Sequence, residues 1–314
     1  MSEIVITEFM DAAVVDELVR DRDVFYDKGL VDRPADLVRE AARCRGLIVR
    51  NRTQVTAELL DQCPNLKVIG RLGVGLENID MAACAARGIE VCPARGANAV
   101  SVAEYVIGTM LILMRGLHRT TAPVIAGEWP RNAFMGREAA GATFGLVGFG
   151  DIARHAAARA SALGMEVIAH DPFVHEEDPV WREMRVRQVS LEDLLADADV
   201  VTLHIPLTDS TRDLIDGTAI ARMKDDAILI NSSRGAIVNE DALIAALKEG
   251  TLGGAALDVF ADEPVTAESG ARFQDVPNLI LTPHIAGVTH QSNRWTSVLT
   301  VRNVLDFLKE EEIK

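Results

Sequence analysis

Short runs of β-branched residues alternate with helical patterns along nearly all of this 314-residue chain. The alternation is typical of parallel sheets covered by helices on both faces, so it predicts an α/β fold. The helical patterns of the N-terminal third lie at residues 56–62 and 81–87. Strands are expected there at residues 4–7, 47–50, 68–71 and 90–92.

A second series of strands begins at Thr143 and has the six strands of a complete dinucleotide-binding sheet. The long helical patterns at 99–115 and 289–309 flank this series, and the second of them returns the chain to the first domain. We therefore predict two Rossmann-like domains with parallel sheets, the first of them discontinuous: residues 1–98 with 288–314, and residues 99–287. The second series is expected at residues 145–147, 166–170, 200–204, 227–231, 255–259 and 279–281.

The composition limits the partners of the chain. Acidic residues outnumber basic residues by 47 to 32, so the net charge of −15 disfavours nucleic acid and anionic membrane surfaces. The four cysteines show no CxxC spacing, which indicates reduced thiols in a cytoplasmic protein and no metal site. No secretory signal opens the chain. The apolar segment 100–114 contains Glu104 and is too short to span a bilayer, so we expect a buried helix or the interface of a homodimer.

A glycine-rich turn follows the expected strand at 144–147 and opens a helix of small residues. Gly148 suits the tight turn, and Gly150 lets a diphosphate approach the N–H groups of the helix start. Asp171 follows about 20 residues later, where a carboxylate binds the ribose hydroxyls and repels a 2′-phosphate. The pattern predicts a site that prefers NAD to NADP; the alternative is a turn that binds no phosphate. The turn reads Gly148-Phe149-Gly150-Asp151-Ile152-Ala153.

Three more segments each follow a strand of the second series, at the sheet edge where open parallel sheets bind ligands. A histidine there can protonate the alkoxide that forms when hydride reaches a keto carbon, and a neighbouring carboxylate stabilises its cation. An arginine presents a planar fork to a carboxylate. The alternatives are a structural histidine and a surface ion pair. The segments are Asn231-Ser232-Ser233-Arg234-Gly235, Leu257-Asp258-Val259-Phe260-Ala261-Asp262-Glu263-Pro264 and Thr282-Pro283-His284-Ile285-Ala286-Gly287.

Together these motifs resemble the D-isomer-specific 2-hydroxyacid dehydrogenases, in particular the branch similar to 3-phosphoglycerate dehydrogenase. The resemblance covers essentially the whole chain, including Leu203-His204-Ile205-Pro206-Leu207-Thr208 and Phe134-Met135-Gly136-Arg137-Glu138. It implies an enzyme that transfers hydride between NAD(H) and C2 of a small anionic D-type 2-hydroxy acid. By resemblance, Arg234 binds the substrate carboxylate and polarises the C2 oxygen, His284 is the general acid/base, and Glu263 supports His284.

The resemblance also implies which other residues bind the ligands. Asp258 would receive the nicotinamide carboxamide, and the N–H groups of the earlier glycine loop would hold the substrate carboxylate. The chain departs from the family at Glu77, where aspartate is frequent, at Asn51, where serine is frequent, and at Asp151, where a basic residue is frequent. The NAD-binding candidates are Gly148, Gly150, Asp151, Ile152, Asp171, His204, Pro206, Thr211, Ser232, Asp258 and Gly287; the substrate-binding candidates are Asn51, Arg52, Arg71, Gly73, Val74 and Gly75.

Arginines cluster at the strand ends of the first domain, although the chain is acidic overall. Arg50, Arg52 and Arg71 lie at or just beyond these ends, which indicates a second anionic group on C3 of the substrate, a phosphate or a sulfonate. The alternative is that they pair with surface acids such as Glu77. The dianions 3-phosphoglycerate and 3-sulfolactate both fit, and the departures at Asn51 and Glu77 favour 3-sulfolactate. A different class remains open: an NAD(H)-sensing corepressor-like binding protein on the same fold.

Overall fold

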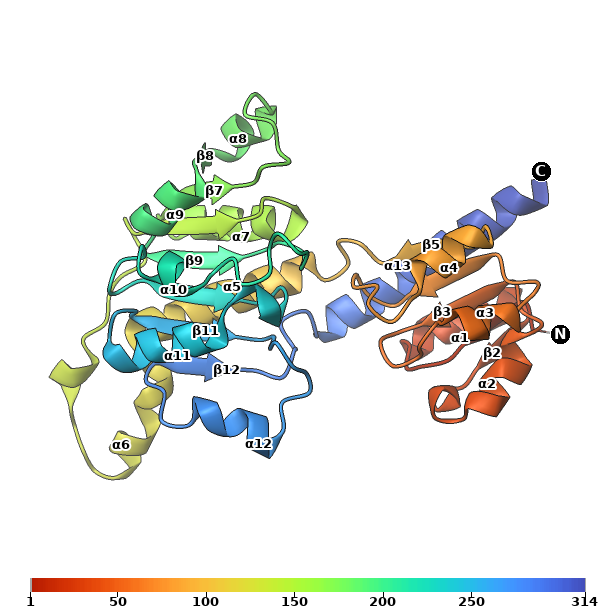
Figure 1. The fold of residues 1–314 in the computed structure, drawn as a ribbon, viewed down its shortest axis with the longest axis horizontal. Helices are drawn as coiled ribbons and strands as arrows, with labels where there is room; N and C mark the ends of the chain where they lie inside the picture. Colours follow the sequence, from red (N-terminus) through yellow and green to blue (C-terminus); the bar gives the residue numbers. More distant parts are fainter. Residues whose placement is uncertain (1, 314) are drawn as a thin grey trace. The chain divides into compact units, whose positions relative to one another are not determined.

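The computed structural model describes residues 2–313 and divides into two compact units, Met1–Asn98 with Val288–Lys314, and Ala99–Gly287. Each unit contains one sheet whose paired strands all run parallel (Figure 1). The predicted fold class, α/β with two parallel-sheet units of which the first is discontinuous, is therefore confirmed.

The first unit is built on a five-stranded sheet of order β2-β1-β3-β4-β5. One face is covered by α1 and α13, and the other face packs against side chains of α2, α3 and α4. The four predicted strands form within a residue of their expected bounds, and the edge strand β2 was not predicted. The elements are β1 Ile4–Ile6, α1 Ala12–Asp21, β2 Val24–Tyr26, η1 Leu30–Asp32, α2 Pro34–Ala41, β3 Gly46–Val49, α3 Ala57–Asp61, β4 Val68–Arg71, α4 Met81–Ala86, β5 Glu90–Pro93 and α13 His290–Ile313.

The C-terminal helix α13 belongs to the core of the first unit because it lies directly on β4. A Cβ atom on Gly70 would lie 2.6 Å from the side chain of Val304 and 2.7 Å from that of Thr300. The Thr300 hydroxyl also donates to the carbonyl of Arg71 at 3.3 Å. Glycine at position 70 therefore allows the helix to approach the sheet, so residues far apart in sequence share one core.

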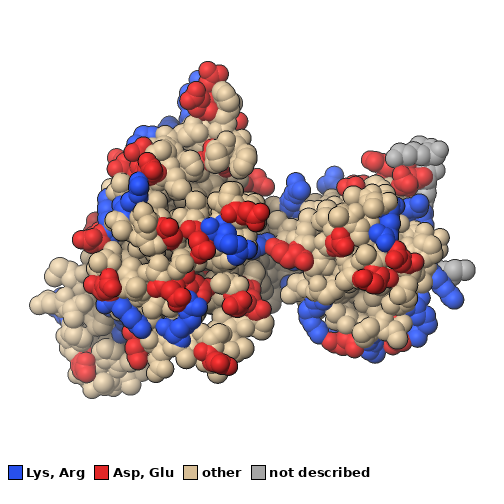
Figure 2. All heavy atoms as spheres, in the orientation of Figure 1, with Lys and Arg blue, Asp and Glu red and all other residues tan. Residues whose placement is uncertain are grey.

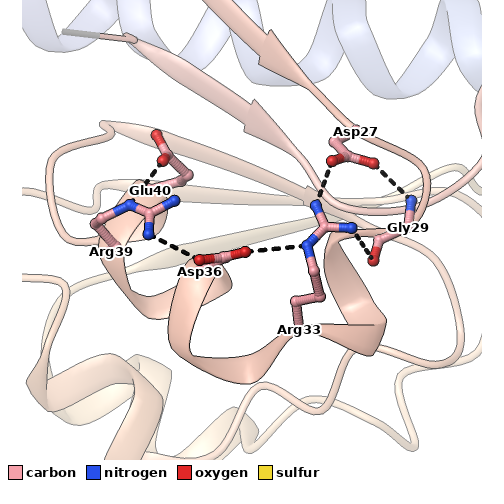
Figure 3. Close-up of polar contacts among 6 residues, drawn as sticks. All are labelled: Asp27, Gly29, Arg33, Asp36, Arg39 and Glu40. Atoms are coloured by element: carbon pink, nitrogen blue, oxygen red, sulfur yellow. Dashed lines mark hydrogen bonds and ion pairs between the residues drawn. The ribbon is translucent and has the colours of Figure 1, made fainter.

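A chain of exposed ion pairs orders the segment between β2 and α2 (Figure 3). The Arg33 guanidinium donates to the carboxylates of Asp27 and Asp36, and Asp36 also pairs with Arg39 at 2.7 Å. Pro34 occupies the first turn of α2, where its missing N–H has no cost. Exposed pairs of this kind add little stability. Asp32 of η1 pairs in turn with Arg52 in the loop that follows β3.

The second unit contains a seven-stranded sheet of order β12-β11-β10-β9-β6-β7-β8. Helices cover both faces, with α5 and α7 on one face and α9, α10 and α11 on the other (Figure 1). The elements are α5 Ala99–Arg115, η2 Leu117–Arg119, α6 Thr121–Ile125, η3 Arg131–Phe134, β6 Thr143–Val147, α7 Asp151–Ala162, β7 Glu166–His170, α8 Pro179–Met184, β8 Arg187–Gln188, α9 Leu191–Asp197, β9 Val200–Leu203, α10 Gly217–Ile220, β10 Ile228–Asn231, η4 Gly235–Ile237, α11 Glu240–Glu249, β11 Gly254–Leu257, α12 Ala267–Gly270, η5 Ala271–Phe273 and β12 Leu279–Leu281.

The prediction of six strands for the second sheet was wrong by one. The additional strand β8 has only two residues, Arg187 and Gln188, and pairs with β7 at the sheet edge. A short strand of polar residues has neither the apolar run nor the alternation by which a strand is predicted. The other strands of the sheet form where the sequence predicts them.

The described residues contain no single helix that is long and apolar enough to cross a membrane. Only α5 and Leu117–Ile125 taken together pass that test, by length and composition, and they are bent by 63°. Within residues 2–313, no three His, Cys, Asp or Glu side chains are grouped so that they could hold a metal ion.

Candidate active site

The glycine-rich turn connects β6 to α7 in the second unit. Gly148 has a φ of +90°, and a Cβ atom there would lie 2.6 Å from the carbonyl oxygen of His204, so only glycine fits. A Cβ atom on Gly150 would meet nothing within 4 Å, so the start of α7 faces open space. Gly150 is the N-cap of α7 and has no side chain to occupy the N–H groups of the first turn. This start can therefore accept the diphosphate of a dinucleotide.

Asp171 lies directly after β7 and faces the glycine-rich turn. Its Oδ2 accepts the N–H of Phe149 at 2.8 Å, and its Oδ1 accepts the N–H of Phe173 at 2.9 Å. Since each carboxylate oxygen can accept two hydrogen bonds, both oxygens keep one position for a ribose hydroxyl. The residue is thus fixed by the backbone of the turn and still able to bind the adenosine ribose.

Other predicted NAD-binding residues line the same edge. Nε2 of His204 forms a hydrogen bond with Oγ1 of Thr202 at 3.1 Å. Burial lowers the pKa of His204 to about 3, so the ring is neutral. The Thr211 hydroxyl donates to the carbonyl of Pro206 at 2.7 Å and thereby orders the turn after β9. Ser232 Oγ is buried and has no hydrogen-bond partner among the described residues. A ligand hydroxyl or amide could satisfy it, which fits a bound dinucleotide.

Two predicted catalytic residues form a hydrogen-bonded pair. Nδ1 of His284 lies 2.8 Å from Oε2 of Glu263, and Oε1 of Glu263 accepts the N–H of Phe260 at 2.9 Å. Because a carboxylate only accepts, Nδ1 carries the hydrogen, and Nε2 is left to exchange a proton with a substrate. His284 adopts a φ of +56°, and its N–H donates to the carbonyl of Asp258 at 2.8 Å.

Asp258 is buried and holds the turn that carries His284. Its Oδ1 accepts the Thr282 hydroxyl at 2.6 Å and the N–H of Ile285 at 2.8 Å, while Oδ2 accepts the N–H of Ala286 at 2.8 Å. Oδ1 is thus fully occupied, and Oδ2 keeps one acceptor position. That position fits the predicted nicotinamide carboxamide, and the other contacts show a second role that the sequence did not reveal.

Arg234 lies in the turn after β10, beside the segment that carries Glu263. Because β10, β11 and β12 are parallel neighbours, the turns with Arg234, Glu263 and His284 leave the sheet at one edge. A Cβ atom on Gly235 would lie 1.8 Å from the carbonyl carbon of Phe260, so these two turns are in direct contact. The Asn231 amide donates to the carbonyl of Arg234 at 2.9 Å and fixes the backbone there.

In the first unit, the predicted substrate-binding residues lie in two loops, after β3 and after β4. Asn51 and Arg52 are exposed in the first loop, and the Arg52 guanidinium pairs with Asp32. In the second loop, the side chain of Arg71 folds back over Gly73. A Cβ atom on Gly73 would lie 1.6 Å from the Arg71 guanidinium, and the Gly73 N–H donates to the carbonyl of Arg71 at 2.8 Å.

One residue of this region was not predicted. Glu8 follows β1, is only 4% exposed, and binds the backbone of the loop after β3. A single acidic residue after a strand of three apolar residues carries no sequence signal for such a role. Only the parallel pairing of β1 with β3 places Glu8 beside this loop.

The chain is similar in sequence and in fold to known proteins. Residues 107–286 match the family model described as D-isomer specific 2-hydroxyacid dehydrogenase, NAD binding domain. The chain belongs to this dehydrogenase family. The (S)-sulfolactate dehydrogenase of Chromohalobacter salexigens is 55% identical to this dehydrogenase over 97% of each chain. The D-3-phosphoglycerate dehydrogenase of Archaeoglobus fulgidus is 39% identical over 87% of this chain and 51% of its own.

A solved structure agrees with this family assignment. The D-lactate dehydrogenase of Aquifex aeolicus, crystallised with NAD and lactic acid, matches with a TM-score of 0.84 and 30% identity over 98% of this chain and 96% of its own. The protein is therefore an NAD-dependent oxidoreductase of 2-hydroxy acids, as predicted. None of the relatives named here supports the alternative of an NAD(H)-sensing corepressor-like protein.

Proposed function

We propose that this dehydrogenase interconverts 3-sulfolactate and 3-sulfopyruvate. The proposal is carried by Arg50, which directly follows β3 and suits a substrate with a second anionic group. The other two arginines of the predicted cluster are engaged, since Arg52 pairs with Asp32 and Arg71 donates to the carbonyl of Leu72. The 55% identity to an (S)-sulfolactate dehydrogenase supports the sulfonate over the phosphate ester.

The label (S) agrees with a family named for D-isomers. In D-lactate the carboxylate outranks the methyl group, and the centre is R. In sulfolactate the carbon that bears sulfur outranks the carboxylate, so the same arrangement in space is named S. A D-specific site would therefore accept (S)-3-sulfolactate without inversion of the face that receives hydride.

The proposed mechanism uses the residues of the second unit for chemistry. NAD, when bound, supplies the hydride acceptor of the reaction. Arg234 binds the substrate carboxylate and polarises the C2 oxygen. Nε2 of His284 takes the hydroxyl proton during oxidation and returns it during reduction, while Glu263 stabilises the imidazolium through Nδ1–H. In the first unit, the N–H groups of Val74 and Gly75 bind the carboxylate, whereas the predicted Gly73 N–H does not, because it donates to the carbonyl of Arg71.

Among the arginines, Arg50 is the best candidate to bind the sulfonate. Arg52 shares its charge with Asp32, whereas Arg50 makes no ion pair with any described residue. Among the described residues, the Arg50 guanidinium contacts neutral groups: the Asn293 side chain at 3.2 Å, the Phe9 carbonyl at 3.5 Å, and the Phe9 ring at 5.8 Å. Its guanidinium is therefore available to pair with an anion.

Steady-state kinetics with a panel of 2-keto acids tests the proposal. We expect kcat/KM for 3-sulfopyruvate to exceed that for pyruvate by about 10²-fold or more, the value of one or two charge-assisted hydrogen bonds. Arg50→Ala should remove most of this preference and leave pyruvate reduction nearly unchanged. Equal use of pyruvate and 3-sulfopyruvate by the parent enzyme would refute the second-anion site. Preference for 3-phosphohydroxypyruvate would assign the phosphate ester instead.

We also propose that the enzyme is a cytoplasmic homodimer. The four free cysteines support the location, since oxidised pairs would be expected outside the cytoplasm.

Helix α5 buries most of its apolar side chains within its own unit, so the apolar residues that follow it are better candidates for the dimer interface. Light scattering of Ile125→Asp, at a position 81% exposed, should show monomers if this segment forms the interface. The candidates are Leu117, Val124, Ile125, Trp129 and Met135.

A further inference from the structure

The loop after β3 is wrapped around the buried carboxylate of Glu8. Oε1 of Glu8 accepts the N–H groups of Arg50 and Thr53, both at 2.9 Å, and Oε2 accepts the N–H of Arg52 at 3.1 Å. On the other side of the loop, the Asn78 amide donates to the carbonyl of Thr53 at 2.7 Å and to that of Arg50 at 3.3 Å. The loop is therefore held from both sides by buried side chains.

Burying a carboxylate is costly unless hydrogen bonds replace its water. Burial raises the pKa of Glu8, but the N–H groups of Thr53, Arg50 and Arg52 and the Thr53 hydroxyl lower it more, so its pKa lies below the ordinary value. Glu8 is therefore ionised at neutral pH. The Glu8 carboxylate thus occupies three of the four N–H groups of residues 50–53, those of Arg50, Arg52 and Thr53, which a substrate anion could otherwise accept.

We infer that Glu8 determines the specificity of the substrate site by positioning the loop 50–53, so that an anionic group on the substrate is bound by guanidinium side chains rather than by loop N–H groups. The inference rests on the proposed function. Glu8 binds the backbone N–H groups of Arg50 and Arg52 and not their side chains, of which Arg50 is partly exposed and Arg52 is exposed.

The charge of Glu8 and its hydrogen bonds have opposite effects on the binding of a dianionic substrate. The negative charge lies near Arg52 and repels a substrate anion, so its removal alone would strengthen the binding of dianions. Its hydrogen bonds hold the loop, so their loss would weaken that binding. The direction of the change in a neutral variant therefore shows which effect prevails.

Glu8→Gln tests the inference because glutamine is nearly isosteric and neutral. Its Nε2 cannot accept the N–H that Oε2 accepts, so the loop must shift at Arg52. We expect the ratio of kcat/KM for 3-sulfopyruvate to that for pyruvate to fall about tenfold or more, the effect of one misplaced charge-assisted hydrogen bond. Thr53→Val, which removes a hydroxyl paired with Thr7 at 2.8 Å, should lower the ratio less and without any change of charge.

Glu3→Gln is the matched control. Glu3 precedes the same strand at its opposite end and pairs with Arg22 at 3.3 Å, so it undergoes the same chemical change away from the loop. The ratio of kcat/KM for 3-sulfopyruvate to that for pyruvate should be the same in Glu3→Gln as in the parent. If the ratio of kcat/KM values in Glu8→Gln is unchanged or higher than in the parent, the inference is overturned. If Glu8→Gln does not fold, an unchanged ratio in Thr53→Val overturns it. A parent enzyme without preference for the dianion would instead overturn the proposed function, and the inference with it.

Discussion

His284 combines an uncommon backbone conformation with an oriented ring. Asparagine tolerates a positive φ better than most residues, so His284→Asn should keep the turn while removing the imidazole. We expect kcat to fall by about 10² to 10⁴-fold, the usual contribution of general acid/base catalysis, with the Kd for NADH within about twofold of the parent. Steady-state rates and NADH fluorescence titration would measure the two values.

The partner of the histidine gives the control for this prediction. Glu263→Gln keeps an acceptor beside Nδ1 but removes the charge that stabilises the imidazolium. Its kcat should fall less than that of His284→Asn. Activity of His284→Asn equal to that of the parent at neutral pH would exclude His284 from the proton transfer.

The position of Asp171 predicts which cofactor the enzyme prefers. Its carboxylate keeps an acceptor position on each oxygen for the ribose, and its charge repels a 2′-phosphate. The parent should therefore prefer NADH to NADPH strongly, and Asp171→Ala should narrow the ratio of kcat/KM values by raising KM for NADH. A parent enzyme that used NADPH as well as NADH would contradict this role.

At the scale of elements, the contact of α13 with β4 is sensitive to added volume. Gly70→Ala would place a methyl group 2.6 Å from Val304, and overpacking of this kind typically costs about 1 to 3 kcal/mol. Urea unfolding should show this loss, and the double variant Gly70→Ala, Val304→Ala should recover part of it. If the loss in free energy of unfolding in the double variant equals the sum of the losses in the two single variants, the methyl group does not contact Val304.

At the scale of the whole molecule, acidic and basic side chains are interspersed over the visible surface, and the acidic excess leaves a net charge of −15 (Figure 2). Two partly or fully buried carboxylates, one in each unit, link stability to pH. For Asp199, burial raises the pKa, but the Thr143 N–H, Lys224 and Arg137 lower it more, and Glu8 is lowered likewise.

Because the pKa of both carboxyls is lowered in the folded protein, we expect the free energy of unfolding to fall in acid. A carboxyl whose folded pKa lies below its unfolded value stabilises the fold fully above the unfolded pKa, which is 4.5 for Glu8 and 3.8 for Asp199. The contribution is lost as the pH falls below those values through the folded pKa. Tm measured from pH 7 to pH 3 should therefore fall, and Asp199→Asn should flatten the fall. An unchanged profile in that variant would show that other carboxyls dominate.

Much of the fold follows from local patterns. The alternation of apolar runs and helices predicted both parallel sheets, and the glycine-rich turn with Asp171 predicted the dinucleotide site, because these signals lie within one strand–helix–strand stretch of the chain. Strand β8 could not be predicted in this way, since Arg187 and Gln188 form a strand only because β7 offers them a free edge.

The sequence by itself determined the fold class, the family and the candidate residues for the chemistry. Only the tertiary structure decided what those residues contact. It placed Asp32 beside Arg52 and left Arg50 without an ion pair among the described residues. It also brought Glu8 to a loop more than 40 positions away and made Asp258 the support of the His284 turn. The physical reason is that hydrogen bonds and charge pairs depend on distances of about 3 Å, which strand pairing sets and sequence spacing does not.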